Sequence, residues 1–103
     1  MEKKQKQPKK QQQKFVAELS NLRKVDCSRY VDEIKRLYGE DVQPYYYYAH
    51  IFGDTATHGN HPFRDGLNIH TSYVLNEYER DGERFIQTMN TLYKVRSNDN
   101  TSD

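Results

Sequence analysis

The chain of 103 residues has no tryptophan, one cysteine and three prolines, and hydrophobic residues make up only 34% of it. The single cysteine, Cys27, excludes an internal disulfide, which fits a reducing, intracellular setting. No apolar run approaches the ~18 residues of a membrane span. The N-terminus, "MEKKQKQPKK", lacks the apolar segment of a secretory signal. We therefore expect one small cytoplasmic domain with a thin hydrophobic core.

Tyrosine is abundant in this otherwise polar chain, which contains nine Tyr and four Phe. These rings supply large apolar area, and the tyrosine ring also carries a polar tip. Exposed tyrosine is typical of protein interfaces, because it gives wide, rigid contact for little loss of entropy.

The formal net charge of +1 conceals an asymmetry between the N-terminus and the rest. Residues 1–14 hold six lysines and one glutamate, whereas the other 89 residues hold ten basic and fourteen acidic residues. We expect disordered ends at 1–14 and 97–103 around a single domain at 15–96. The basic arm either contacts an anionic partner or only keeps the chain soluble. Its lysines are Lys3, Lys4, Lys6, Lys9, Lys10 and Lys14.

Two stretches of the first half have helical spacing. "FVAELSNLRKV" places Phe15, Leu19 and Leu22 on one face, and "DCSRYVDEIKRLYG" continues the pattern as far as Gly39. We expect one bent helix or two short helices, broken near residues 25–27.

After Pro44 the period of the sequence pattern changes from 3.6 to 2. "YYYYAHIF" (residues 45–52) is β-prone with rings on both faces. "LNIHTSYVLNEY" (residues 67–78) is predicted as the longest strand, beginning after a turn at Asp65-Gly66.

Two hairpins are expected near the C-terminus. Asp81-Gly82 is the best short hairpin signal in the chain, and "RFIQT" and "TLYKV" are predicted to turn at Met89-Asn90. The predicted fold class is α+β, with an N-terminal helix or helix pair followed by a three- to four-stranded antiparallel β-meander.

All four histidines fall within residues 50–70, and they are His50, His58, His61 and His70. Zinc needs three or four convergent ligands, so these histidines are the candidate metal ligands. No cysteine lies nearby and the loop is rich in turn formers, which favours ordinary loop and strand-edge histidines. We predict no metal and no other cofactor.

Catalysis has little support in the sequence. A nucleophile would have to be Cys27, Thr71 or Ser72 beside a positioned base, and no nucleophile elbow or Cys-His signature is present. No glycine-rich loop follows a strand in a way that would cradle phosphate. The chain is therefore predicted not to be an enzyme.

Two binding roles remain open. Tyrosines and an acidic hairpin tip suit docking on a basic protein surface, such as the nucleic-acid channel of a nuclease. The predicted protein-binding residues are Tyr46, Tyr48, Tyr73, Tyr78, Glu77, Glu79, Asp81 and Glu83. The alternative combines the arm lysines with a tyrosine-rich sheet, which together offer counterion release and base stacking to nucleic acid. The acidic charge outside the arm conflicts with that alternative, because stacking surfaces normally lie in positive grooves.

The spacing "HPFRDGLNIHTSYV … FIQTMNTLYKV" resembles a small β-rich module in short proteins of bacteriophages and other mobile elements. The matching residues are His61, Phe63, Asp65, Gly66, Ile69, Thr71, Ser72, Val74, Thr88, Asn90, Tyr93 and Val95. The resemblance does not extend to the helical half or to the basic arm. It implies a phage or mobile-element origin and an antiparallel sheet of three or four strands, and it implies no activity.

The matched residues have evident folding roles. Asp65-Gly66 suits a turn, Ile69 suits a core, and the hydroxyls of Thr71 and Thr88 can bond the backbone. A phage origin would favour a non-enzymatic accessory protein that binds a host or phage protein complex stoichiometrically in the bacterial cytoplasm. An inhibitor of a host defence nuclease, of the anti-CRISPR or anti-restriction kind, is the leading expectation, with nucleic-acid binding as the alternative.

Overall fold

The computed structural model describes residues 15–55 and 62–96. The predicted basic arm and C-terminal tail lie outside them. Within the described residues no helix is long and apolar enough to cross a membrane. The elements are strand β1 (Ala17–Asp26), a 3-10 turn (Ser28–Tyr30), helix α1 (Val31–Tyr38), and strands β2 (Tyr45–Phe52), β3 (Leu67–His70), β4 (Val74–Arg80), β5 (Glu83–Thr88) and β6 (Leu92–Val95).

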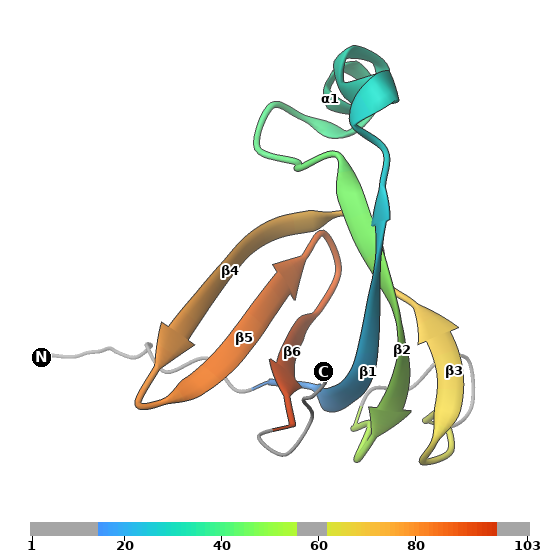
Figure 1. Cartoon of the computed structure of the whole chain (residues 1–103), viewed down its shortest axis with the longest axis vertical. Helices are drawn as coiled ribbons and strands as arrows, with labels where there is room; N and C mark the ends of the chain where they lie inside the picture. The colour runs from blue at the N-terminus through green and yellow to red at the C-terminus, as the bar shows by residue number, and fades with distance from the viewer. Residues whose placement is uncertain (1–14, 56–61, 97–103) are drawn as a thin grey trace, which may run out of the picture.

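The six strands form one mixed sheet in the order β3-β2-β1-β6-β5-β4 (Figure 1). Strand β1 lies inside the sheet, antiparallel to β2 and parallel to β6, and the other pairs are antiparallel. The predicted α+β class is confirmed. The sheet is larger than the predicted three to four strands, and the β1–β6 pair makes it mixed rather than a simple meander.

The first stretch predicted as a helix is strand β1, so that prediction is wrong. Ala17 and Leu19 are fully buried and alternate with the more exposed Glu18. The β1–β2 register shifts between residues 20 and 23, where Asn21 has a φ of 55°. This irregularity lets Leu19 and Leu22, three residues apart, both pack into the core. A strand with such an irregularity therefore buries apolar residues three positions apart, which is also the spacing of apolar residues on one face of a helix.

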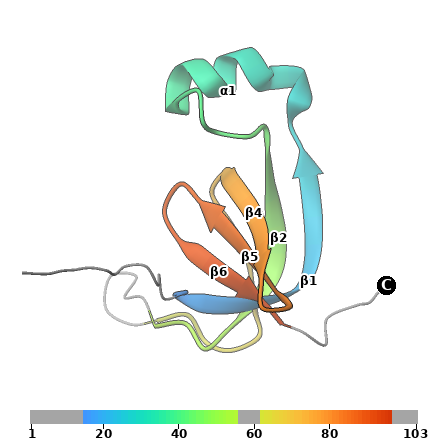
Figure 2. The ribbon, with the colours of Figure 1, turned by 90° about the vertical axis from the view of Figure 1, so that its left-hand side faces the viewer.

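The second helical stretch is confirmed as α1. Asp26 Oδ1 accepts hydrogen bonds from the Ser28 backbone N–H (3.0 Å) and hydroxyl (2.7 Å), which shape the turn that leads into the helix. The helix ends at Gly39, where φ is 117°. Ile34 is the one α1 residue that is buried. In Figure 2 the helix stands at the end of the β1–β2 ladder, clear of the other strands.

The stretch predicted as the longest strand is divided into β3 and β4, which lie at opposite edges of the sheet. The division occurs at Thr71, whose backbone N–H donates to the Tyr47 carbonyl (2.8 Å) and whose Oγ1 accepts from the Tyr47 N–H (3.1 Å). A strand that bonds its neighbour through a side-chain oxygen no longer continues the regular ladder. Alternation alone does not reveal this break.

The predicted turns are confirmed. Gly66 precedes β3 with a φ of 86°, and Asp81 and Gly82 join β4 to β5 with φ of 54° and 79°. At the β5–β6 turn the Thr88 hydroxyl oxygen accepts hydrogen bonds from the N–H groups of Asn90 (3.3 Å) and Thr91 (3.1 Å).

The sheet curls strongly, and its concave side holds the core. Tyr47 of β2 packs with Val74 of β4 and Ile86 of β5, although three strands separate β2 from β4 in the sheet order. Strands β4 and β5 consequently face β2 across the concave side of the sheet, as Figure 1 shows. Because side chains alternate along a strand, the curl leaves the even-numbered residues of β2 on the outer face.

Candidate functional site

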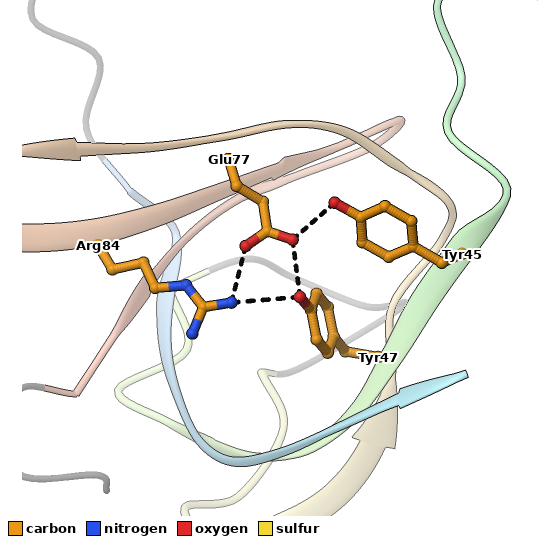
Figure 3. Close-up of polar contacts among 4 residues, drawn as sticks. All are labelled: Tyr45, Tyr47, Glu77 and Arg84. Carbon is orange, nitrogen blue, oxygen red and sulfur yellow. Dashed lines mark hydrogen bonds and ion pairs between the residues drawn. The ribbon is translucent and has the colours of Figure 1, made fainter. Parts of the chain in front are cut away.

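Four polar side chains join β2 to β4 and β5 on the concave side (Figure 3). Glu77 Oε2 accepts hydrogen bonds from the hydroxyls of Tyr45 and Tyr47, both at 2.7 Å. Glu77 Oε1 accepts one from Arg84 Nη2 at 2.7 Å, and the same nitrogen lies 3.2 Å from the Tyr47 hydroxyl oxygen. Lys24 Nζ lies 4.1 Å from the centre of the Tyr45 ring.

Each titratable group of this network has one charge state at neutral pH. Burial alone would raise the pKa of Glu77, but the hydrogen bonds from Arg84, Tyr47 and Tyr45 outweigh it and lower that pKa. Burial, together with the hydrogen bond to Glu77, raises the pKa of Tyr45 to about 12 and also raises that of Tyr47. Glu77 is therefore ionised and both phenols are neutral. Both carboxylate oxygens are occupied, so the arrangement serves to hold the curled sheet together.

A second group of rings lies on the outer face, and we call Tyr46, Tyr48, His50 and Phe52 of β2, with His70 of β3, the outer track. The β2–β3 register places Tyr48 opposite His70, and their ring centres are 5.7 Å apart. The ring centre of Tyr46 lies 5.9 Å from that of Tyr48 and 5.8 Å from that of His70. The track is partly open to solvent, since Tyr48 is 38% exposed.

Arginines and amides flank the outer track. Arg23 of β1 lies opposite Tyr48 and donates to Asn68 Oδ1 of β3 and to the Asn21 carbonyl (3.1 Å). The Asn21 amide nitrogen lies 3.4 Å from His50 Nδ1. At the other end the Arg96 guanidinium lies 4.0 Å from the Phe52 ring centre. Such a surface offers ring faces, amide groups and positive charge together.

Acidic residues are scarce on this face. Strands β1 to β3 contain two carboxylates, Glu18 and Asp26. Glu18 accepts from Arg96 Nε at 2.9 Å and lies 3.9 Å from Lys94, whereas Asp26 pairs in register with Tyr45 and so shares the opposite face. The other carboxylates of residues 15–55 and 62–96 belong to α1, to loops and to the β4–β5 hairpin. Within the described residues, most of the acidic charge therefore lies off β1 to β3, although Asp65 accepts from the Gly53 N–H at 2.8 Å, next to Phe52.

A pocket of about 340 Å³ opens at the α1 end of the track. Its lining comes from Tyr38 of α1, Tyr46 of β2, residues 70–73 and the turn at residues 89–90. Tyr73 joins it to the track, with its ring centre 5.5 Å from Tyr38 and 5.9 Å from Tyr46. The Ser72 hydroxyl is buried, and it has no hydrogen-bond partner within the described part of the chain.

The structure brings together three of the predicted protein-binding residues, Tyr46, Tyr48 and Tyr73. Tyr78 lies elsewhere and stacks on Phe85 with ring centres 5.4 Å apart.

The four predicted acidic residues do not form one uniform acidic tip. Glu77 points into the concave network, and Glu83 lies 2.9 Å from Lys94. Glu79 and Asp81 are exposed near the β4–β5 turn.

The remaining candidates divide between the two parts of the chain. His50 and His70 lie on the outer face, whereas His58, His61 and the six arm lysines lie outside the described residues. In residues 15–55 and 62–96 no three His, Cys, Asp or Glu side chains gather as a metal ion requires.

Sequence reasoning missed Arg23 and Arg96 as site residues. Arg23 fell in a stretch predicted as helix, so its place opposite Tyr48 depends on a register that the sequence does not reveal. Arg96 follows the last strand and meets Phe52 only because β6 pairs with β1. The one usable signal in the sequence was the period of two, which places Phe52 on the same face of its strand as Tyr46 and Tyr48.

Three residues of the resembling pattern have clear folding roles. Asp65 Oδ1 accepts from the Gly53 N–H at 2.8 Å, and the hydroxyls of Thr71 and Thr88 accept from backbone N–H groups as described above. No protein-family model, curated protein or solved structure matches the chain. The function is therefore inferred from the geometry of the outer face.

Proposed function

We propose that the protein is a non-enzymatic accessory protein that binds single-stranded nucleic acid along the outer track. The observation that supports this most directly is the row formed by Arg23, Tyr48 and His70 across three adjacent strands. Proteins that bind single strands combine aromatic side chains, on which bases stack, with positive charge that follows the phosphates. Exposed amides beside the rings can bond base edges.

The spacing of the rings suits an extended strand. Residues on one face of a β-strand recur about every 6.8 Å, so Tyr46, Tyr48, His50 and Phe52 form a regular series along β2. That interval is comparable with one nucleotide of an extended single strand. Arg23 would then contact phosphates from the β1 side of the track, whereas Arg96 is already paired with Glu18 at 2.9 Å.

The distribution of charge supports an anionic partner. The one carboxylate on the track side of β1 to β3, Glu18, is matched by Arg96 and Lys94. Residues 1–14 carry six lysines and one glutamate and join the described chain directly at Phe15. Lys94 Nζ lies 5.4 Å from the centre of the Phe15 ring, where Glu83 (2.9 Å) and Glu18 (3.9 Å) balance its charge. Counterion release from the bound strand would favour binding at low salt.

Fluorescence anisotropy with a labelled single strand of about twelve nucleotides tests the proposal. Tyr48→Ala is expected to weaken binding about 5- to 150-fold, because one stacked base is worth about 1–3 kcal/mol. Tyr30→Ala is the matched control, since Tyr30 is 54% exposed but precedes α1, away from the track. Equal effects of the two substitutions, or no effect of either, would contradict the proposal.

The salt dependence provides a second measurement. Arg23→Ala should reduce the slope of log affinity against log salt by about one unit, whereas Arg36→Ala on α1 should leave it unchanged. Deleting residues 1–14 should reduce the slope further and leave the effect of Tyr48→Ala intact. A slope that neither change alters would argue against contact with phosphates.

A second candidate function is stoichiometric docking on a protein, as an inhibitor of a host defence nuclease would require. It is favoured by the exposed apolar residues at the helix, Tyr30 and Leu37, of which Leu37 is 65% exposed. A pull-down from bacterial lysate separates the two functions. A partner that survives nuclease treatment and is lost in Leu37→Lys would support protein docking, whereas capture abolished by nuclease would support the nucleic-acid proposal.

A further inference from the structure

We infer that the pocket beside Ser72 is a subsite for one unpaired nucleobase at the α1 end of the outer track. The inference rests on the proposed function and adds a specific contact to it. It depends on three features of the pocket: its walls, its charge and its unpartnered hydroxyl.

The walls suit a flat ring. Tyr38, Tyr46 and Tyr73 contribute aromatic surface, and Met89 contributes a flexible apolar side chain. Ring contacts run without interruption from Tyr38 through Tyr73 to Tyr46, which also belongs to the track. A strand that follows the track can therefore deliver its terminal or splayed base into the pocket without leaving the sheet surface.

The lining contains no Lys, Arg, Asp or Glu side chain. A phosphate group would lack a cation there, and a cationic side chain would lack a carboxylate. A neutral heterocycle avoids both penalties, because it is apolar on its faces and polar at its edge.

Ser72 lines the pocket, and because its hydroxyl oxygen is enclosed by protein atoms, rotation of the side chain about the Cα–Cβ bond is needed to present it to such an edge. Its buried hydroxyl has no partner among residues 15–55 and 62–96, although buried polar atoms are normally hydrogen-bonded. A hydroxyl both donates and accepts, so it can bond either a ring nitrogen or an exocyclic group of a base.

His70 adds an acceptor to the same lining. Its Nδ1 lies 3.2 Å from the Thr71 carbonyl oxygen, which can only accept a hydrogen bond. Nδ1 therefore carries the proton, and in the neutral imidazole Nε2 remains an acceptor. An exocyclic amino group could donate to it.

Two labelled strands with the same number of phosphates test the inference, one with bases and one with abasic sites throughout. Wild-type protein should bind the strand with bases more tightly. Ser72→Ala should weaken that binding about 3- to 10-fold, the value of one hydrogen bond, and leave the abasic strand unaffected. Ser28→Ala is the matched control, because Ser28 lies before α1 and bonds Asp26.

Thermal unfolding of Ser72→Ala distinguishes a ligand contact from a structural one. The melting temperature should not fall, because the hydroxyl has no partner to lose in the described chain. Tyr38→Ala, at a ring that is 50% exposed, provides a second variant and should also weaken binding only of the strand with bases.

The outcomes separate this inference from the proposed function. If Ser72→Ala and Tyr38→Ala bind both strands as wild type does, while Tyr48→Ala still weakens binding, the pocket assignment is wrong and the track proposal stands. If wild-type protein binds neither strand, or binds both equally, both proposals are wrong.

Discussion

Glu77 shows how a single carboxylate can hold a small, tyrosine-rich fold together. It lies on β4 and accepts hydrogen bonds from two tyrosines of β2 and from Arg84 of β5. Because β2 and β4 are not sheet neighbours, these bonds fix how far the sheet curls. The same four consecutive tyrosines thus serve two purposes, with Tyr45 and Tyr47 bonding inward and Tyr46 and Tyr48 forming the outer track.

The stability should depend on the charge of Glu77. A carboxyl whose pKa is lowered by folding adds stability above its unfolded pKa, about 4.3, and loses it as the pH falls through the folded pKa. Glu77→Gln should therefore lower the free energy of unfolding in urea by roughly 1–3 kcal/mol at about pH 7. The difference from wild type should shrink at about pH 3.

Glu79→Gln is the control for this prediction, because Glu79 lies on the same strand but is exposed. Its effect should stay within about 0.5 kcal/mol. A Glu77→Gln difference that grows as the pH falls would show that the carboxylate is not held in its charged form by the network.

The Thr71 hydroxyl should also be important for stability. Thr71→Val keeps the shape of the side chain but leaves the buried Tyr47 N–H without its acceptor, at a cost of about 1–3 kcal/mol. Thr55→Val is the matched control, since the exposed Thr55 hydroxyl bonds the Val16 carbonyl and water can replace it. Equal losses of stability in urea titrations would contradict the assigned role.

At the scale of elements, the sequence predicted what depends on local chemistry. The Asp81-Gly82 hairpin, the 45–52 strand and the end of α1 at Gly39 follow from turn residues, alternation and capping, and all are confirmed. The bulge at Asn21 and the break at Thr71 depend on pairing with distant strands, so β1 was predicted as a helix and β3–β4 as one strand. The same long-range pairing put Arg23 beside Tyr48, beyond the reach of sequence reasoning.

The β4–β5 hairpin offers a test of local backbone preference. Gly82 has a φ of 79°, and an added Cβ would meet nothing within 4 Å, so the cost of Gly82→Ala is confined to the backbone. We expect a loss of about 1–2 kcal/mol, seen as a lower melting temperature. Gly82→Asn should cost less, because asparagine tolerates a positive φ. Equal losses would point to a different turn conformation.

At the scale of the whole molecule, the curled sheet separates two surfaces of opposite character. The concave side buries the core and the Glu77 network, while the outer side of β1 to β3 presents rings and arginines. A net charge near zero therefore conceals a surface with distinct regions, and the overall charge is a poor guide to what the protein binds.

Hydrogen exchange should report the position of each strand in the sheet. Amides of β6 and of the first part of β1 (residues 17–19), which have paired strands on both sides, should exchange most slowly, and those of the short edge strand β3 most rapidly. Mass spectrometry of peptides from these strands provides the measurement. Faster exchange in β1 than in β3 would contradict the strand order.

The parallel pairing of β1 with β6 has a consequence for synthesis on the ribosome. β1 is the earliest strand of the described chain to be translated, yet one of its two neighbours is the latest. Until β6 emerges, a nascent chain carries an open strand edge in the middle of its future sheet, which is a template for pairing with other chains. Emergence of β6 from the ribosome, rather than the formation of any local hairpin, is thus the event that allows the protein to close its sheet.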